Sequence, residues 1–176
     1  MNKKKWMKIL FLSFLVVCVG QAKSQIASDT KSKLDEHKIV IDIPVDLGKA
    51  NVVFNMDHLA FAGDLPVGIN YMHLLANRFQ EMKTKGQIIG VFQGDAAYMT
   101  LNDETYNIYR KVTTGNPYKG LIAELIKQGV QIEECAVSMK GHAWGNENLL
   151  SGVKVNSGAV SRLIQLMQDG YVQIQP

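Results

Sequence analysis

Apolar positions along the chain follow two different spacings. Short runs rich in β-branched residues, bounded by glycine or polar residues, lie at 50–55, 87–92, 130–135, 152–155 and 171–174. Between these runs, apolar residues recur at helical spacing over 67–82, 102–113, 116–128 and 157–169. The alternation predicts short strands separated by helices, with Asn102 and Asn116 opening helices and Gly129 ending one.

Strands separated by helices are typical of a mostly parallel sheet, joined by right-handed crossovers. We therefore expect an α/β domain over residues 49–176, with a mostly parallel sheet of about five strands, helices on both faces and flavodoxin-like layering. Ligands gather at the carboxyl ends of the strands in such sheets. The turns at 55–58 and 93–94, together with the loop after residue 135, should meet at that edge.

The first 24 residues are typical of a secretory signal peptide. The segment 1–8 contains four lysines and no acid, and the apolar run 9–20 is too short to span a bilayer. Small residues at Ala22 and Ser24 predict cleavage between Ser24 and Gln25. A lipoprotein signal would use Cys18 instead, although Val17 is bulkier than the small residue expected before such a cysteine. An uncleaved membrane anchor is a third alternative. Cleavage before Gln25 is favoured, and it places the mature protein in the periplasm or outside the cell.

Residues 25–48 are expected to form a polar arm. Its first part, 26–38, is rich in Ser, Asp, Lys and Thr. The β-branched run 37–44 ends in Pro44, which suits an edge strand or an arm laid on a neighbouring subunit.

Charge and motif content exclude several classes of partner. The leader holds five of the 19 basic residues, so the mature chain carries a small excess of acids over bases and no basic stripe. This pattern argues against nucleic acid as a partner, and no stable membrane insertion is expected after cleavage. Four scattered histidines, with no CxxC or HExxH motif, predict neither a metal site nor a cofactor.

Cys135 is the single cysteine of the mature chain, and it ends the third strand. Only a thiolate is nucleophilic, and its population depends on positive or dipolar neighbours, which Lys140 and His142 could supply. Glu133 and Glu134 precede the cysteine and would raise its pKa if their carboxylates point the same way. Free cysteine is also often a buried, inert residue, so both roles stay open at this stage.

Other candidate ligand-binding residues surround the same edge of the predicted sheet. They are Asn55, Asp57, His58, Gly94, Ser138 and Trp144. The pair Asp57-His58 suits an acid/base pair, half of a metal site, or a turn that satisfies main-chain groups. The loop 142–146 suits a lid over the strand ends, in which Trp144 contacts a ligand or packs as an anchor.

The order of these features over residues 49–176 resembles the DsrE/DsrF-like proteins, small α/β subunits known from sulfur relay and sulfur oxidation. The resemblance is carried by Asn70, Gly94, Asn116-Pro117, the segment 125–130, Cys135, Ser138, Lys140-Gly141, the segments 152–155 and 170–172, and Pro176. The closer branch of the family often has glycine after the cysteine, where this chain has Ala136.

The resemblance implies that Cys135 accepts sulfur as a persulfide, with Lys140 as the nearest basic group that favours its thiolate. It also implies a trimer or hexamer that exchanges sulfane sulfur with a donor and an acceptor. Export separates the protein from cytoplasmic partners, which makes a role in tRNA thiolation unexpected. Two functions therefore remain: an exported sulfur carrier or sulfurtransferase, and a non-catalytic oligomeric ligand-binding or assembly module with the same fold.

Overall fold

The computed structural model describes residues 39–176. The expected signal peptide, Cys18, the cleavage site before Gln25 and the first part of the arm lie outside the described residues. Residues 39–45 contain no helix or strand, so the edge strand expected over 37–44 is not formed in the described part of that run. A strand needs a neighbour to pair its main-chain groups, and pairing with another subunit stays a prediction. The compact unit comprises Asp46–Pro176.

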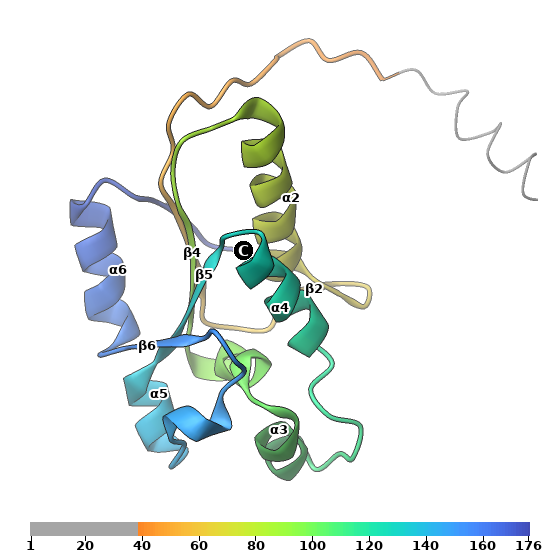
Figure 1. The fold of residues 1–176 in the computed structure, drawn as a ribbon, viewed down its shortest axis with the longest axis vertical. Coiled ribbons are helices and arrows are strands. Elements are labelled where there is room, and N and C mark those ends of the chain that lie inside the picture. The colour runs from red at the N-terminus through yellow and green to blue at the C-terminus, as the bar shows by residue number, and fades with distance from the viewer. Residues whose placement is uncertain (1–38) are drawn as a thin grey trace, which may run out of the picture. The chain divides into compact units, whose positions relative to one another are not determined.

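Five parallel strands form the main sheet of this unit, as the sequence predicts (Figure 1). They are β1 (Val52–Met56), β4 (Ile88–Phe92), β5 (Gln131–Cys135), β6 (Lys154–Asn156) and β7 (Val172–Ile174). Their order across the sheet is β6-β5-β4-β1-β7, and each neighbouring pair is parallel. Every residue of β1 and β4 is buried, which explains why these segments are continuously apolar or nearly so rather than alternating.

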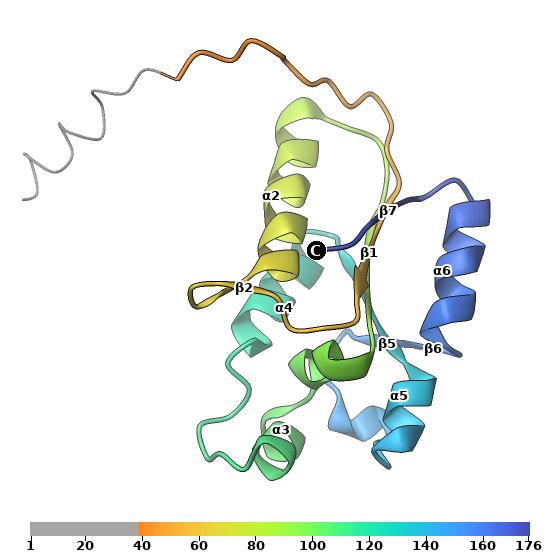
Figure 2. The same cartoon turned by 180° about the vertical axis from the view of Figure 1, so that it is seen from behind.

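Helices cover both faces of the sheet. The helices α2 (Val67–Met82) and α4 (Lys119–Lys127) lie on one face, and α6 (Ala159–Gln168) lies on the other (Figures 1 and 2). Phe54, Met72 and Ile122 belong to the core on the first face. The core on the second face contains Val53 and Leu163, so adjacent residues of β1 point to opposite layers.

Several short elements were not expected from the sequence. A hairpin of β2 (Phe61–Ala62) and β3 (Leu65–Pro66) precedes α2, and a 3-10 helix, η1 (Gly94–Thr100), follows β4. A short helix, α5 (Ala136–Gly141), stands where the sequence suggested a loop, and η2 (Asn146–Asn148) follows it. These elements are too short to show a repeated apolar period.

The helix α3 (Asp103–Arg110) begins as expected, because the Asn102 side chain accepts a hydrogen bond from the Thr105 N–H at 2.9 Å. None of the helices among residues 39–176 is both long and apolar enough to cross a bilayer.

Gly94 brings two of the strand ends together. Its φ of +53° lies in the left-handed region, and a Cβ at this position would stand 2.7 Å from the Asp57 carbonyl oxygen. Its main-chain N–H donates to Ser138 Oγ at 3.2 Å. Only glycine allows the turn after β4 to approach both the end of β1 and α5 in this way.

We expect Gly94→Ala to lower the free energy of unfolding by about 2 kcal/mol, because the new methyl group meets main-chain atoms in a conformation that alanine disfavours. Chemical denaturation measures the change. Gly120→Ala is the matched control: Gly120 lies in α4 with open space around its Cα, and alanine there should stabilise the protein by about 0.5 kcal/mol. Equal effects of the two substitutions would contradict this account of Gly94.

Candidate functional site

The carboxyl ends of β1, β4 and β5 meet at one edge of the sheet, as the sequence predicts for this topology. Asn55 on β1 is the centre of a side-chain network there. Its Oδ1 accepts from Gln93 Nε2 at 2.8 Å, and its Nδ2 donates to Gln175 Oε1 at 2.7 Å. Because Asn55 is 9% exposed and both ends of its amide are occupied, it holds the strand ends and the chain terminus together rather than presenting free groups to a ligand.

Asp57 and His58 form a close pair at the rim of this network. His58 Nδ1 lies 2.5 Å from Asp57 Oδ1, and Gln175 Nε2 donates to the same oxygen at 2.9 Å. Partial burial raises the pKa of Asp57, but the hydrogen bonds from His58 and Gln175 outweigh it, so the pKa lies below its usual value. Asp57 is therefore a carboxylate at neutral pH that orients the His58 ring, and both side chains are substantially exposed.

Cys135 lies between the first turns of two helices. It is the residue that precedes α5, and its Sγ accepts a hydrogen bond from the main-chain N–H of Ala159 at 3.3 Å, where α6 begins. The main-chain N–H and the hydroxyl of Ser138, in the first turn of α5, also favour the thiolate form of the sulfur. The residue is 4% exposed, so its sulfur is surrounded by protein groups rather than by solvent.

These donors set the acidity of the thiol. Burial raises the pKa of Cys135, but hydrogen bonds from the main chain of Ser138, Ala159 and Val137 and from the Ser138 hydroxyl favour the thiolate more strongly. The pKa therefore lies below the ordinary value for cysteine. Since Ser138 Oγ also accepts from the Gly94 N–H, the turn after β4 is hydrogen-bonded to a residue that favours the thiolate.

Lys140 and His142, the two groups that the sequence offered as thiolate stabilisers, do not make these bonds. Lys140 is exposed near the end of α5. His142 belongs to an aromatic cluster, where its ring stacks on Trp144 with centroids 4.5 Å apart and also contacts Tyr98 and Tyr109. Main-chain N–H groups, rather than these two side chains, provide the positive partial charge that favours the thiolate. They point toward the sulfur because a helix begins directly after Cys135.

Trp144 acts as a packing anchor in the structure. It is 7% exposed and lies in a core cluster with Tyr106, Met139 and Leu149, separate from the cluster that contains Cys135. Its indole Nε1–H has no hydrogen-bond partner among the described residues. Of the two alternatives for the 142–146 loop, the packing role of Trp144 is the one that its burial supports.

The two glutamates before the thiol point to opposite faces of the sheet. Glu133 faces α6, where Arg162 Nε and Nη2 donate to its carboxylate at 2.8–3.1 Å. Burial raises the pKa of Glu133, but the bonds from Arg162 and Gln131 hold it below its usual value. Glu134 faces the opposite layer and contacts Thr100. Sequence reasoning did not assign Thr100, Ala159 or Arg162 to the site, because neither their residue type nor their spacing marks them.

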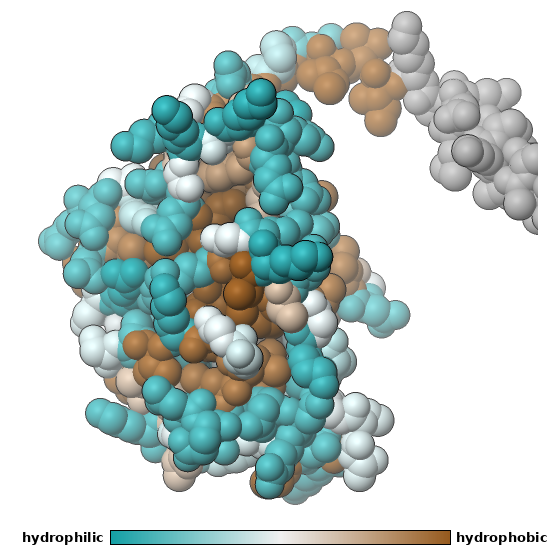
Figure 3. Space-filling model, in the orientation of Figure 1, coloured by the Kyte–Doolittle hydropathy of each residue, from teal (hydrophilic) through white to brown (hydrophobic). Residues whose placement is uncertain are grey.

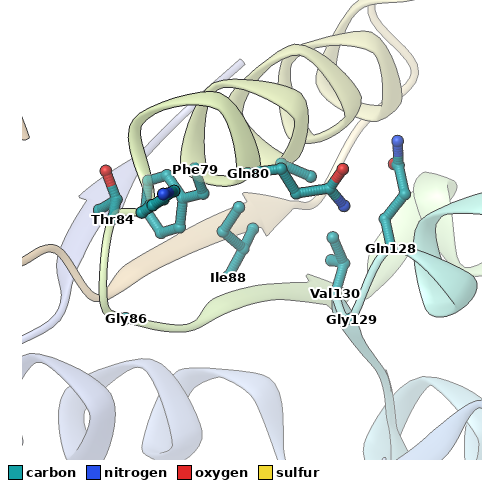
Figure 4. A pocket seen from close by; sticks show the side chains of 10 residues that line it. Phe79, Gln80, Thr84, Gly86, Ile88, Gln128, Gly129 and Val130 are labelled. Carbon is teal, nitrogen blue, oxygen red and sulfur yellow. The ribbon is translucent and has the colours of Figure 1, made fainter.

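One surface hollow lies far from the thiol, and a second includes Glu133 of the strand that carries it. The first has a volume of about 350 Å³ and lies at the amino ends of β4 and β5, the edge opposite Cys135 (Figure 4). Phe79, Ile88 and Val130 are among its apolar lining residues, with Gln80 and Gln128 beside them. The second, of about 650 Å³, lies beside β6 and α6 and includes Glu133, Asn156 and Arg162. Cys135 lines neither of them, and residues 39–176 contain no group of three potential metal ligands.

Comparison with solved structures supports the fold. A protein of unknown function from Methanobacterium thermoautotrophicum, MTH1491, matches with a TM-score of 0.56 and 21% identity, over 72% of this chain and 99% of the other. The ychN protein from E. coli matches with a TM-score of 0.50 and 16% identity, again over 72% of this chain and 99% of the other. No curated protein matches the sequence.

The family model described as the DsrE/DsrF-like family matches residues 52–176, which is the whole sheet with its helices. The match begins at the first residue of β1 and includes Cys135 and the donors around its sulfur. The resemblance read from the sequence is thereby confirmed, and the chain belongs to the DsrE/DsrF-like family.

Proposed function

We propose that the protein is a sulfur carrier that holds sulfane sulfur on Cys135. The observation that supports this most directly is the set of donors around Sγ, which favours the thiolate although the residue is buried. A thiolate attacks the outer sulfur of a persulfide or polysulfide. The new S–S bond forms on Cys135 as the donor's S–S bond breaks, and the donor leaves as a thiolate. Attack by an acceptor thiolate on the outer sulfur then restores Cys135.

A second function, a non-catalytic ligand-binding or assembly module, is favoured by one specific observation. Cys135 is 4% exposed and packs with Val53, Ile89 and Leu163. Buried cysteines in such clusters often serve only to fill space. The two functions differ in whether the thiol ionises and accepts sulfur near neutral pH.

Polysulfide treatment separates the two functions. We expect wild type to gain the mass of one or more sulfur atoms and Cys135→Ser to gain none, as measured by mass spectrometry of the intact protein. We also expect Ser138→Ala to raise the pKa of the thiol, followed by thiolate absorbance, because the sulfur loses its hydroxyl donor. Lys140→Ala is the matched control within α5 and should shift the titration less, since Lys140 makes none of these bonds.

The opposite pattern supports the assembly module. In that pattern the thiol titrates at or above pH 8.5, roughly the ordinary value, and takes up no sulfur. The Cys135→Ser variant would also be less stable than wild type, by about 3 kcal/mol or more.

We also propose that the protein is exported after cleavage of the leader. Expression of the full chain in a bacterial host should give a protein that is released by osmotic shock and begins at Gln25, as determined by N-terminal sequencing. A lipid-modified Cys18, or retention of the uncleaved chain in the cytoplasm, contradicts this placement.

Assembly into a homo-oligomer, with a trimer or hexamer as the expected form, is a further part of the proposal. Three apolar residues one turn apart on α6, Val160, Ile164 and Met167, are 67%, 49% and 46% exposed. On or next to α3, Ile108, Tyr109 and Val112 are also exposed. Figure 3 shows that apolar atoms reach the surface in the middle of the face drawn in Figure 1. Faces of this kind are usually covered by another subunit.

Sedimentation velocity of the purified mature protein at micromolar concentration tests the assembly. We expect one species larger than a monomer. A monomer as the sole species refutes the proposal and excludes any site that is shared between subunits.

A further inference from the structure

Glu134 is a fully buried acid next to the thiol. It is 0% exposed, and among the described residues its carboxyl group has no cationic partner. Its Oε2 lies 2.8 Å from Thr100 Oγ1, and its Oε1 accepts from the main-chain N–H of Cys135 at 3.0 Å. Its neighbour Glu133, also buried, instead forms an ion pair with Arg162. The two acids therefore differ in how burial is compensated.

The geometry around Thr100 indicates where a proton resides. Thr100 Oγ1 lies 2.9 Å from the Ala97 carbonyl oxygen and 2.8 Å from Glu134 Oε2. A hydroxyl carries one proton, and a carbonyl oxygen only accepts. Both contacts are two-centre hydrogen bonds at the same time only if Thr100 donates to Ala97 and Glu134 donates to Thr100. The carboxyl group of Glu134 must then be protonated.

The burial of this carboxyl group leads to the same conclusion by a separate route. Burial raises the pKa of Glu134 to about 8 and outweighs the hydrogen bond from the main-chain N–H of Cys135, and the neighbouring Cys135 charge raises the pKa further. Charged groups on the elements around it do not face it. Asp95 is exposed at the start of η1, Lys154 on β6 reaches Gln131 on the other face, and Lys140 is exposed on α5.

We propose that Glu134 is a positioning residue for the thiol, a buried proton carrier whose ionisation competes with that of Cys135. Its carboxyl group is hydrogen-bonded to the main chain of the residue that bears the thiol. A carboxylate at this place and a thiolate on Cys135 repel each other in surroundings that contain little water. Ionisation of either group therefore disfavours ionisation of the other, and the thiolate forms more readily while Glu134 keeps its proton. This inference rests on the proposed function, since it concerns the same thiol.

The test uses alkylation by iodoacetamide, which reports the thiolate without any sulfur transfer. Rates are measured from about pH 5 to about pH 10 for wild type and Glu134→Gln, whose amide resembles the protonated acid in shape. In wild type the alkylation rate should rise gradually with pH, because Cys135 and Glu134 titrate together. Glu134→Gln should show the steep rise of a single group at lower pH, with a rate at about pH 8 at least about threefold above wild type.

The effect of the Cys135 thiolate on the ionisation of Glu134 supplies a second measurement, which uses the Cys135→Ser variant. Difference infrared spectra should contain the C=O band of a protonated buried carboxyl group at neutral pH in wild type, and Glu134→Gln should lack it. In Cys135→Ser the band should disappear at lower pH than in wild type, because no thiolate opposes the ionisation of Glu134.

The raised pKa of Glu134 also makes the folding stability of the protein depend on pH. The folded pKa of Glu134 is raised above the value of 4.5 for the unfolded chain, so its contribution is complete below pH 4.5 and is lost as the pH rises to about 8. Wild type should lose stability across this range more than Glu134→Gln does.

Identical alkylation profiles in wild type and Glu134→Gln, or an ionised Glu134 at neutral pH in the infrared spectra, would overturn the inference. Failure of sulfur uptake alone would refute the sulfur-carrier function and leave this coupling intact.

Discussion

The main-chain hydrogen bonds of the parallel sheet determine which side chains of this protein can act together. The register pairs Met56 with Phe92 and Phe92 with Glu134, so β1, β4 and β5 end within one residue of each other. Asn55, Gly94 and Cys135 come from positions far apart in the chain and meet only because of this alignment. A shift of one residue in any of these strands would move its side chains to the other face and separate them.

Because side chains alternate along β5, the consecutive residues Glu133, Glu134 and Cys135 lie in different surroundings. Glu133 and Cys135 face α6, and Glu134 faces η1. Glu133 finds a guanidinium partner and is stabilised as an anion, whereas Glu134 finds a hydroxyl and is stabilised as an acid. The thiol lies among main-chain donors at the start of two helices. Three ionisable groups in sequence thus have three different electrostatic environments within one strand.

Much of this architecture was predictable from the sequence because burial leaves a periodic trace. The long helix α2 and the fully buried strands β1 and β4 were predicted to within about two residues, and Asn102 was correctly identified as a cap. The helices η1 and α5 were not predicted, since seven and six residues are too few to show a period. Lys140 and His142 were chosen for their charge, but apart from the Ser138 hydroxyl the groups that favour the thiolate belong to the main chain, which no residue type reveals. Thr100 was missed for a similar reason: its importance comes from standing opposite Glu134, 34 positions later.

The hydrogen bond from Ala159 to the sulfur has a consequence for the surface of the protein. Ala159 opens α6, so Cys135 Sγ accepts one of the first main-chain N–H groups of the helix, which have no partner within the helix. Any atom added to the sulfur changes the acceptor that this first turn uses. The next residue of α6 is Val160, whose side chain is 67% exposed. The chemical state of the buried Cys135 sulfur is therefore linked, through the main-chain amide of Ala159, to the exposed face of α6.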